Sequence, residues 1–185
     1  MIHLKLLRDQ PTLTGANVRL EPMGTQHFEG LWPMFADAEG QRLTATLRRF
    51  TEEQVRAGLA RARGRTDRAD WAIVRVADDE VLGEAVLHQL DEDNCSMSYL
   101  VSLVGPEVFG RGYGTEATRL VRDFALGPLN LHRLSLEVLA FNKRAIAVYV
   151  TCGFVREGVR REALWRDRRW HDVIDMAIIS GDPRP

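Results

Sequence analysis

Residues 104–117 read VGPEVFGRGYGTEA and place three glycines, Gly110, Gly112 and Gly114, within five positions. This stretch lies between a predicted strand over 96–104 and a predicted helix that begins near Tyr113. Glycines at such a junction let backbone N–H groups approach an anion, and the helix N-terminus adds positive potential. The stretch therefore indicates an anion-binding loop, although a loop that only needs positive φ angles would carry the same glycines.

Two known phosphate motifs partly match this loop. Gly105–Gly110 spells GxxxxG, but Arg111 and Gly112 stand where a P-loop needs lysine followed by serine or threonine, which excludes a P-loop. Gly112–Ala117 satisfies the GxGxxA pattern of dinucleotide sites, and Glu137 lies 20 residues further on, where a ribose-binding acid is sought. This fingerprint follows an antiparallel meander and leaves too little chain for a doubly wound sheet. A dinucleotide-binding enzyme remains an alternative.

Outward from the loop, the hydrophobic pattern predicts an α+β domain with its helices early and its strands in a meander. Apolar residues recur along 113–124 at helical spacing, which predicts one buried stripe. The strands that we expect cover residues 18–21, 71–76, 81–90, 96–104, 133–139 and two segments after Phe154 around Trp165–Trp170. The helices that we expect cover 27–36, 51–63, 113–126 and 142–152, the second with Thr51 as its N-cap.

Composition bounds the class of protein. The chain has 185 residues, of which 45% are hydrophobic and 28% charged, proportions that exclude disordered and collagen-like chains. The net charge of −1 gives no indication of nucleic-acid binding, and no apolar run is long enough for a membrane span. Cys95 and Cys152 form no disulfide framework, and Met1–Gln10 is no signal peptide, so we expect a cytoplasmic protein. The five histidines lack the spacing of a metal site.

The loop and a second segment together resemble a known family. Residues 104–117 resemble the pyrophosphate loop of the GNAT superfamily of acetyl-CoA-dependent N-acetyltransferases. Asn142–Ile146, continuing through Tyr149 to Gly153–Phe154, resembles the second signature of that superfamily. Asn142–Trp165 and Trp170–Met176 are also similar to its ribosomal-protein N-terminal and spermidine acetyltransferase branches. One position departs from the family pattern, since the loop usually opens with Gln or Arg and here carries Phe109.

The resemblance implies a fold and a site for acetyl-CoA. It implies a single GNAT-like domain over 17–180, between an N-terminal extension (1–16) and a C-terminal tail (181–185). Its sheet would be twisted, mostly antiparallel, of about six to seven strands flanked by helices and splayed between the fourth and fifth strands. The pantetheine arm would lie on the backbone of Ser102, Leu103 and Val104, with the Val104 N–H as candidate oxyanion donor. The remaining residues that the resemblance assigns to the cosubstrate are Gly110, Arg111, Gly112, Tyr113, Gly114, Thr115 and Asn142.

The resemblance also assigns catalytic roles. Tyr149, seven residues after Asn142, matches the tyrosine that protonates the departing thiolate, and a phenol with a pKa of about 10 holds its proton at neutral pH. Glu137, five residues before Asn142, matches the general base of the N-terminal acetyltransferase branch, and Glu84 is the rival base. From the residues alone, Tyr149 also fits an aromatic core position, and Glu137 a solvent-facing charge. A water chain is the further alternative for the base.

The function implied is acetyl transfer to a primary amine, either a protein N-terminal α-amine or a small-molecule amine, without a metal. A domain of this fold that binds coenzyme A or another anion without catalysis is the alternative from another class. The acceptor would be selected by Asp37–Arg68 and by the Trp165–Trp170 loop, where the resemblance is weakest. Protein N-termini, polyamines, amino acids and aminoglycosides all remain open as acceptors. Related enzymes also suggest a homodimer.

Overall fold

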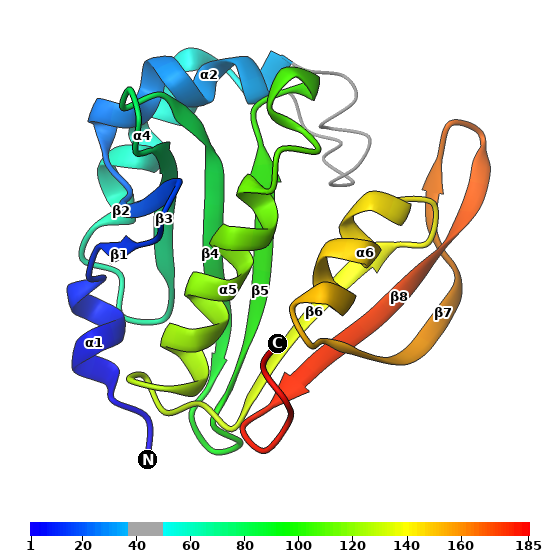
Figure 1. Ribbon diagram of the computed structural model, residues 1–185. Coiled ribbons are helices and arrows are strands. Elements are labelled where there is room, and N and C mark those ends of the chain that lie inside the picture. Colours follow the sequence, from blue (N-terminus) through cyan, green and yellow to red (C-terminus); the bar gives the residue numbers. More distant parts are fainter. Residues whose placement is uncertain (37–49) are drawn as a thin grey trace.

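An eight-stranded sheet runs through the computed structural model, which describes residues 1–36 and 50–185 (Figure 1). The strands are β1 (Leu13–Thr14), β2 (Val18–Pro22), β3 (Ala69–Arg75), β4 (Val81–Asp91), β5 (Ser96–Leu103), β6 (Arg133–Leu139), β7 (Val155–Arg166) and β8 (Arg169–Ile179). Their order across the sheet is β1-β2-β3-β4-β5-β6-β8-β7, and all neighbours are antiparallel except β5 and β6. The sequence predicts about six to seven strands. The additional strand is β1, whose two residues are too few to show a hydrophobic period.

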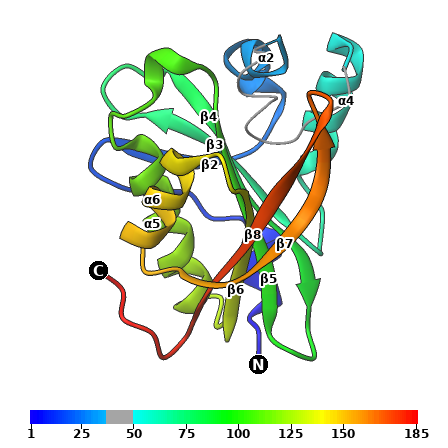
Figure 2. The same cartoon turned by 90° about the vertical axis from the view of Figure 1, so that its right-hand side faces the viewer.

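Helices cover both faces of this sheet. They are α1 (Leu4–Asp9), α2 (Phe28–Ala36), α4 (Glu52–Ala62), α5 (Tyr113–Leu126) and α6 (Lys143–Thr151), with short 3-10 turns at Thr25–His27 and Pro106–Val108. Figure 2 shows α5 and α6 on one side of the sheet and α4 on the other. Successive strand residues point to opposite faces, so Trp71 and Ile73 join the α5 core while Ala72 and Val74 pack with α2 and α4. Within the described ranges, no helix combines the length and apolar character that crossing a membrane requires.

Helix α5 follows directly from the glycine loop. It begins at Tyr113, after Gly112 in the left-handed backbone region, and the predicted apolar stripe faces the sheet with Ala117 and Val121 fully buried. The Phe124 and Trp71 rings pack edge to face with their centroids 5.7 Å apart, a favourable aromatic geometry. Docking of this stripe fixes the N-terminus of α5, and hence the loop, against the sheet.

Residues 1–16 pack onto the same core. Leu7 of α1 is fully buried, and β1 pairs with β2. The indole N–H of Trp71 donates a hydrogen bond to the Pro11 carbonyl oxygen at 2.9 Å. This segment therefore contributes to the sheet and to its core.

The sheet is open between β5 and β6. The two strands pair in parallel only where Ser96–Ser98 face Arg133–Ser135, and they part beyond that point. Counted from β2, these are the fourth and fifth strands, so the predicted splay is confirmed. Gly83 of β4 has a φ of 154°, and a Cβ there would collide with the Ser102 carbonyl oxygen. A glycine at this position lets β4 approach the end of β5 closely, where the opening is widest.

Candidate functional site

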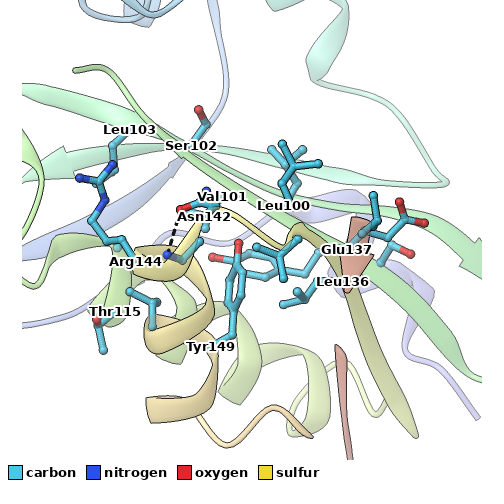
Figure 3. Close-up of a pocket in the computed structure, with 18 of the residues that line it drawn as sticks. Leu100, Val101, Ser102, Leu103, Thr115, Leu136, Glu137, Asn142, Arg144 and Tyr149 are labelled. Atoms are coloured by element: carbon cyan, nitrogen blue, oxygen red, sulfur yellow. Dashed lines mark hydrogen bonds between the residues drawn. The ribbon is translucent and has the colours of Figure 1, made fainter. Parts of the chain in front are cut away.

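A cavity of about 650 Å³ fills the opening between β5 and β6. Its wall combines the ends of β4 and β5, the glycine loop, one face of α6, strand β6 and the β7–β8 hairpin. Figure 3 places Arg144 and Glu137 at opposite ends of the labelled residues, with Tyr149 between them. The cavity therefore runs from the glycine loop and α6, past Tyr149, to the outer part of β6.

The glycine loop has the geometry of an anion cradle. Gly110 and Gly112 have φ angles of 72° and 86°, in the region that favours glycine. A Cβ at either position would meet no atom within 4 Å, so the space beside the backbone is open to a ligand. Five of the six loop residues predicted for the cosubstrate line the cavity: Gly110, Gly112, Tyr113, Gly114 and Thr115. Arg111 is exposed and is not among the lining residues.

The backbone prediction for β5 needs a correction. The Val104 N–H, expected as oxyanion donor, donates to the Leu82 carbonyl oxygen of the preceding hairpin strand at 2.9 Å, so that prediction is wrong. Alternate residues of a strand direct their backbone groups to opposite edges. Since Val104 faces β4, Ser102 faces β4 as well, whereas Val101 and Leu103 face the opening. The Met97 carbonyl oxygen, which accepts a hydrogen bond from the Ser135 hydroxyl of β6 at 3.4 Å, agrees with this alternation.

The free edge at the opening therefore belongs to Val101 and Leu103. Both line the cavity, and no strand of the described ranges pairs with β5 beside them on this edge. Their N–H and C=O groups can bind an extended ligand as a neighbouring strand would. Leu103 was predicted for this role and Val101 was not, because the sequence does not reveal which edge of each residue pairs with β4.

Tyr149 lies in the middle of the cavity wall. It is a buried residue of α6 that packs against Phe154 with ring centroids 5.9 Å apart, and Figure 3 shows its ring reaching from α6 toward β5. Burial, and then the neighbouring Cys152, raise the pKa of the Tyr149 phenol above its ordinary value. The hydroxyl is therefore protonated at neutral pH and available as a donor to a group in the cavity.

Asn142 connects the cavity to α6. Its side-chain oxygen accepts a hydrogen bond from the Ala145 N–H at 3.2 Å and caps the helix (Figure 3). Asn142 also lines the cavity, so its amide NH₂ is available to a ligand while its oxygen holds the cap.

The two candidate bases occupy different environments. Glu137 lines the outer end of the cavity, has 68% of its side chain exposed and forms an ion pair with Arg160 at 2.5 Å. Arg160 also binds Asp175, the cross-strand neighbour of Glu137. This pairing fixes the Glu137 carboxylate at the cavity mouth.

Glu84 lies on the neighbouring strand β4, opposite Ser102, and is not among the lining residues. Burial, with a smaller contribution from the Asp70 carboxylate, raises the pKa of Glu84 to about 7. A carboxyl group with this pKa gains and loses its proton near neutral pH, so Glu84 remains a candidate general base although it does not line the cavity.

The lining residues that were not predicted from the sequence include two with ionisable side chains, His88 and Arg144. His88 of β4 is partly buried, and that burial, followed by the charge of Arg68, lowers its pKa. Arg144 of α6 stacks on Phe109 across the loop. His88 belongs to no local motif. Arg144 lies within the Asn142–Ile146 segment, but its position beside Phe109 in the cavity wall depends on the tertiary fold.

Comparison with known proteins identifies the family of this site. Residues 17–155, about three quarters of the chain, match the acetyltransferase (GNAT) domain family. The chain belongs to the GNAT acetyltransferase family. As a member it uses acetyl-CoA as acetyl donor, and the glycine cradle and free β5 edge fit that molecule. The mostly antiparallel sheet and the family match together rule out the dinucleotide-binding alternative.

Individual relatives are distant. The acetyltransferase is 28% identical over 170 residues to the probable N-acetyltransferase YjcK of Bacillus subtilis, covering 90% of this chain and 88% of that protein. It is 29% identical over 108 residues to a spermidine N(1)-acetyltransferase of Vibrio cholerae, covering 58% of this chain and 62% of the relative. Among solved structures, the Vibrio cholerae spermidine N-acetyltransferase in complex with CoA and spermine superposes with a TM-score of 0.82 at 19% identity, covering 90% of this chain and 97% of the other. This last likeness shows a shared fold.

Proposed function

We propose that this acetyltransferase transfers the acetyl group of acetyl-CoA directly to a primary amine, with Tyr149 as general acid and Glu137 as general base. The observation that carries the proposal is the free edge of β5 at Val101 and Leu103. It opens into a cavity that has the glycine loop at one end and Glu137 at the other. Acetyl-CoA lies along this edge with its phosphates at the loop and its thioester beside Tyr149. The amine enters from the Glu137 end.

In the reaction, the amine nitrogen attacks the thioester carbonyl carbon and passes a proton to Glu137, directly or through water. A backbone N–H of the free β5 edge stabilises the negative charge that develops on the carbonyl oxygen. The C–S bond then breaks, and Tyr149 gives its proton to the thiolate sulfur. A neutral amine loses one proton and the thiol gains one, so solvent returns the proton to Tyr149 and takes it from Glu137.

The high pKa of Tyr149 is compatible with this role. Burial disfavours any anion that loses its hydration, so the environment that raises the pKa of the phenol also raises that of a thiolate beside it. Tyr149 stabilises the leaving group by hydrogen bonding first, and the proton transfers as negative charge builds on sulfur.

For the acceptor we propose a molecule with a single reactive amine, such as a peptide N-terminus or an amino-acid derivative. In the part of the chain that the structure describes, the carboxylates around the outer cavity already face arginines. Glu137 and Asp175 share Arg160, and Glu157 pairs with Arg133. A polyamine needs several unpaired carboxylates for its several charges. Asp37–Arg49, part of the segment predicted to select the acceptor, lies outside the described residues.

The order of the chemical steps is testable by initial-rate kinetics. Cys152 is buried, its thiol donates to the Thr115 carbonyl oxygen at 3.6 Å, and burial raises its pKa, all of which disfavour an acetyl-cysteine intermediate. Direct transfer predicts intersecting double-reciprocal lines when both acetyl-CoA and the amine are varied. Parallel lines, with an acetylated protein detected by mass spectrometry in the absence of amine, would contradict direct transfer.

A further inference from the structure

The cavity wall contains two arginines, and only one of them is neutralised. Arg160 is held by Glu137 and Asp175. Arg144, at the loop end, forms no ion pair with a carboxylate of the described residues. Its guanidinium carbon instead lies 3.9 Å from the centre of the Phe109 ring. Among the residues that the structure describes, the loop end of the cavity therefore carries an uncompensated positive charge.

Phe109 holds this charge in a defined place. A guanidinium that lies over an aromatic face is attracted by the ring electrons and keeps its N–H donors at its edge, free to bind an anion. Phe109 directly precedes Gly110, and Arg144 is the second residue of α6, so the contact joins the loop to the helix that carries Tyr149. Figure 3 shows Arg144 at the end of the labelled residues farthest from Glu137.

We propose that Arg144, held on the Phe109 ring, binds the pyrophosphate of acetyl-CoA and replaces the polar side chain that the loop lacks at position 109. This proposal rests on acetyl-CoA as the donor and on its phosphates lying at the glycine loop. Arg111, the arginine within the loop itself, lies outside the cavity wall. The pyrophosphate cradle thus combines backbone N–H groups from the loop with one guanidinium from α6, 33 residues further along the chain than Arg111.

The direct test is isothermal titration with coenzyme A, the reaction product, which binds without turnover. Arg144→Ala should weaken its binding by about 10- to 50-fold, the effect expected for one charged hydrogen-bonding group. Lys143→Ala is the matched control, because Lys143 is a neighbouring exposed cation that does not line the cavity, and its affinity should stay within about twofold of wild type. Far-UV circular dichroism of each variant verifies the fold. Equal affinities of Arg144→Ala and wild type would overturn the proposal.

A double-mutant cycle tests the stacking. Phe109→Leu keeps an apolar side chain but removes the ring face, so it should lose part of the affinity that Arg144→Ala loses. The double variant should bind no more weakly than Arg144→Ala alone. Fully additive losses would show that Phe109 does not position Arg144.

Dephospho-coenzyme A, which lacks the 3′-phosphate, identifies the phosphate that Arg144 contacts. The same fold loss in Arg144→Ala with this ligand supports the pyrophosphate, and disappearance of the loss would overturn that assignment in favour of the 3′-phosphate. If the wild-type protein did not bind coenzyme A at all, the proposed acetyltransferase reaction would be refuted. If the wild type bound tightly and Arg144→Ala bound equally well, only the role of Arg144 would be refuted.

Discussion

Replacement of Glu84 by glutamine should stabilise the fold at alkaline pH and leave it unchanged in acid. Burial and the neighbouring Asp70 carboxylate raise the pKa of Glu84 from 4.5 to about 7. Below about pH 4.5 both the folded and the unfolded chain hold the proton, so ionisation of Glu84 has no effect on stability. Between these pKa values the unfolded chain releases its proton first, so the wild-type free energy of unfolding falls as the pH rises. Above about pH 7 the loss is complete.

The structure sets the size of this loss. The rise from 4.5 to about 7 corresponds to about 3 kcal/mol at most, since one pKa unit is worth somewhat more than ~1 kcal/mol. Because Glu84 is only partly buried, we expect about 2 kcal/mol. Glutamine has nearly the shape of the protonated carboxyl group, so Glu84→Gln should gain this amount at about pH 8 and nothing at about pH 4.

Urea unfolding of both proteins across this pH range measures the difference. Glu92→Gln, in the exposed turn between β4 and β5, is the matched control and should show no pH-dependent gain. If the difference in the free energy of unfolding between Glu84→Gln and wild type did not change with pH, the raised pKa of Glu84 would be refuted. If Glu84→Gln instead lost most of its kcat/KM together with an inflection near pH 7, Glu84 would be the general base in place of Glu137.

Four further substitutions test the site. Gly112→Val should abolish acetyl-CoA binding in titration calorimetry while the protein stays folded, because a branched Cβ fills the space beside the loop and strains a φ of 86°. Unchanged affinity of the folded variant would refute the loop assignment. Phe109→Ala should weaken binding far less, and comparable losses would show that Phe109 contributes more than we expect. Tyr149→Phe should keep acetyl-CoA affinity and lower kcat by about 10²-fold in a thiol-release assay, and turnover within a few-fold of wild type would leave Tyr149 as core packing only. Glu137→Gln should lower kcat/KM and recover part of it as the pH rises, because the amine then deprotonates unaided. Glu84→Gln should lower kcat/KM less than Glu137→Gln does. Wild-type rates and pH profiles in both variants would favour a water chain as the base.

Local features of the site were predictable from the sequence because they are fixed by neighbouring residues. The positive φ angles of Gly110 and Gly112, the start of α5 at Tyr113 and the Asn142 cap all depend on a few adjacent positions. The opening between two strands could be expected only from the family resemblance, since it depends on where strand pairing stops.

Features that depend on register or on long-range contact were not predictable. Val104 was assigned to the oxyanion although its N–H binds Leu82, because a shift of one residue exchanges the two edges of a strand. Arg144 and Phe109 are 35 positions apart, and no periodicity joins them. The uncompensated charge at the loop becomes visible only when the ion pairs of the cavity wall are known.

The most direct test of the account is the release of coenzyme A from acetyl-CoA, followed with a thiol reagent in the presence and absence of primary amines. The panel contains peptides with free N-termini, amino-acid amides and spermidine. We expect release that depends on an amine, is fastest with a single-amine acceptor and is strongly reduced in Tyr149→Phe. Acetyl-CoA that binds tightly but releases no thiol with any amine would contradict the account and would favour a domain that binds coenzyme A without catalysis.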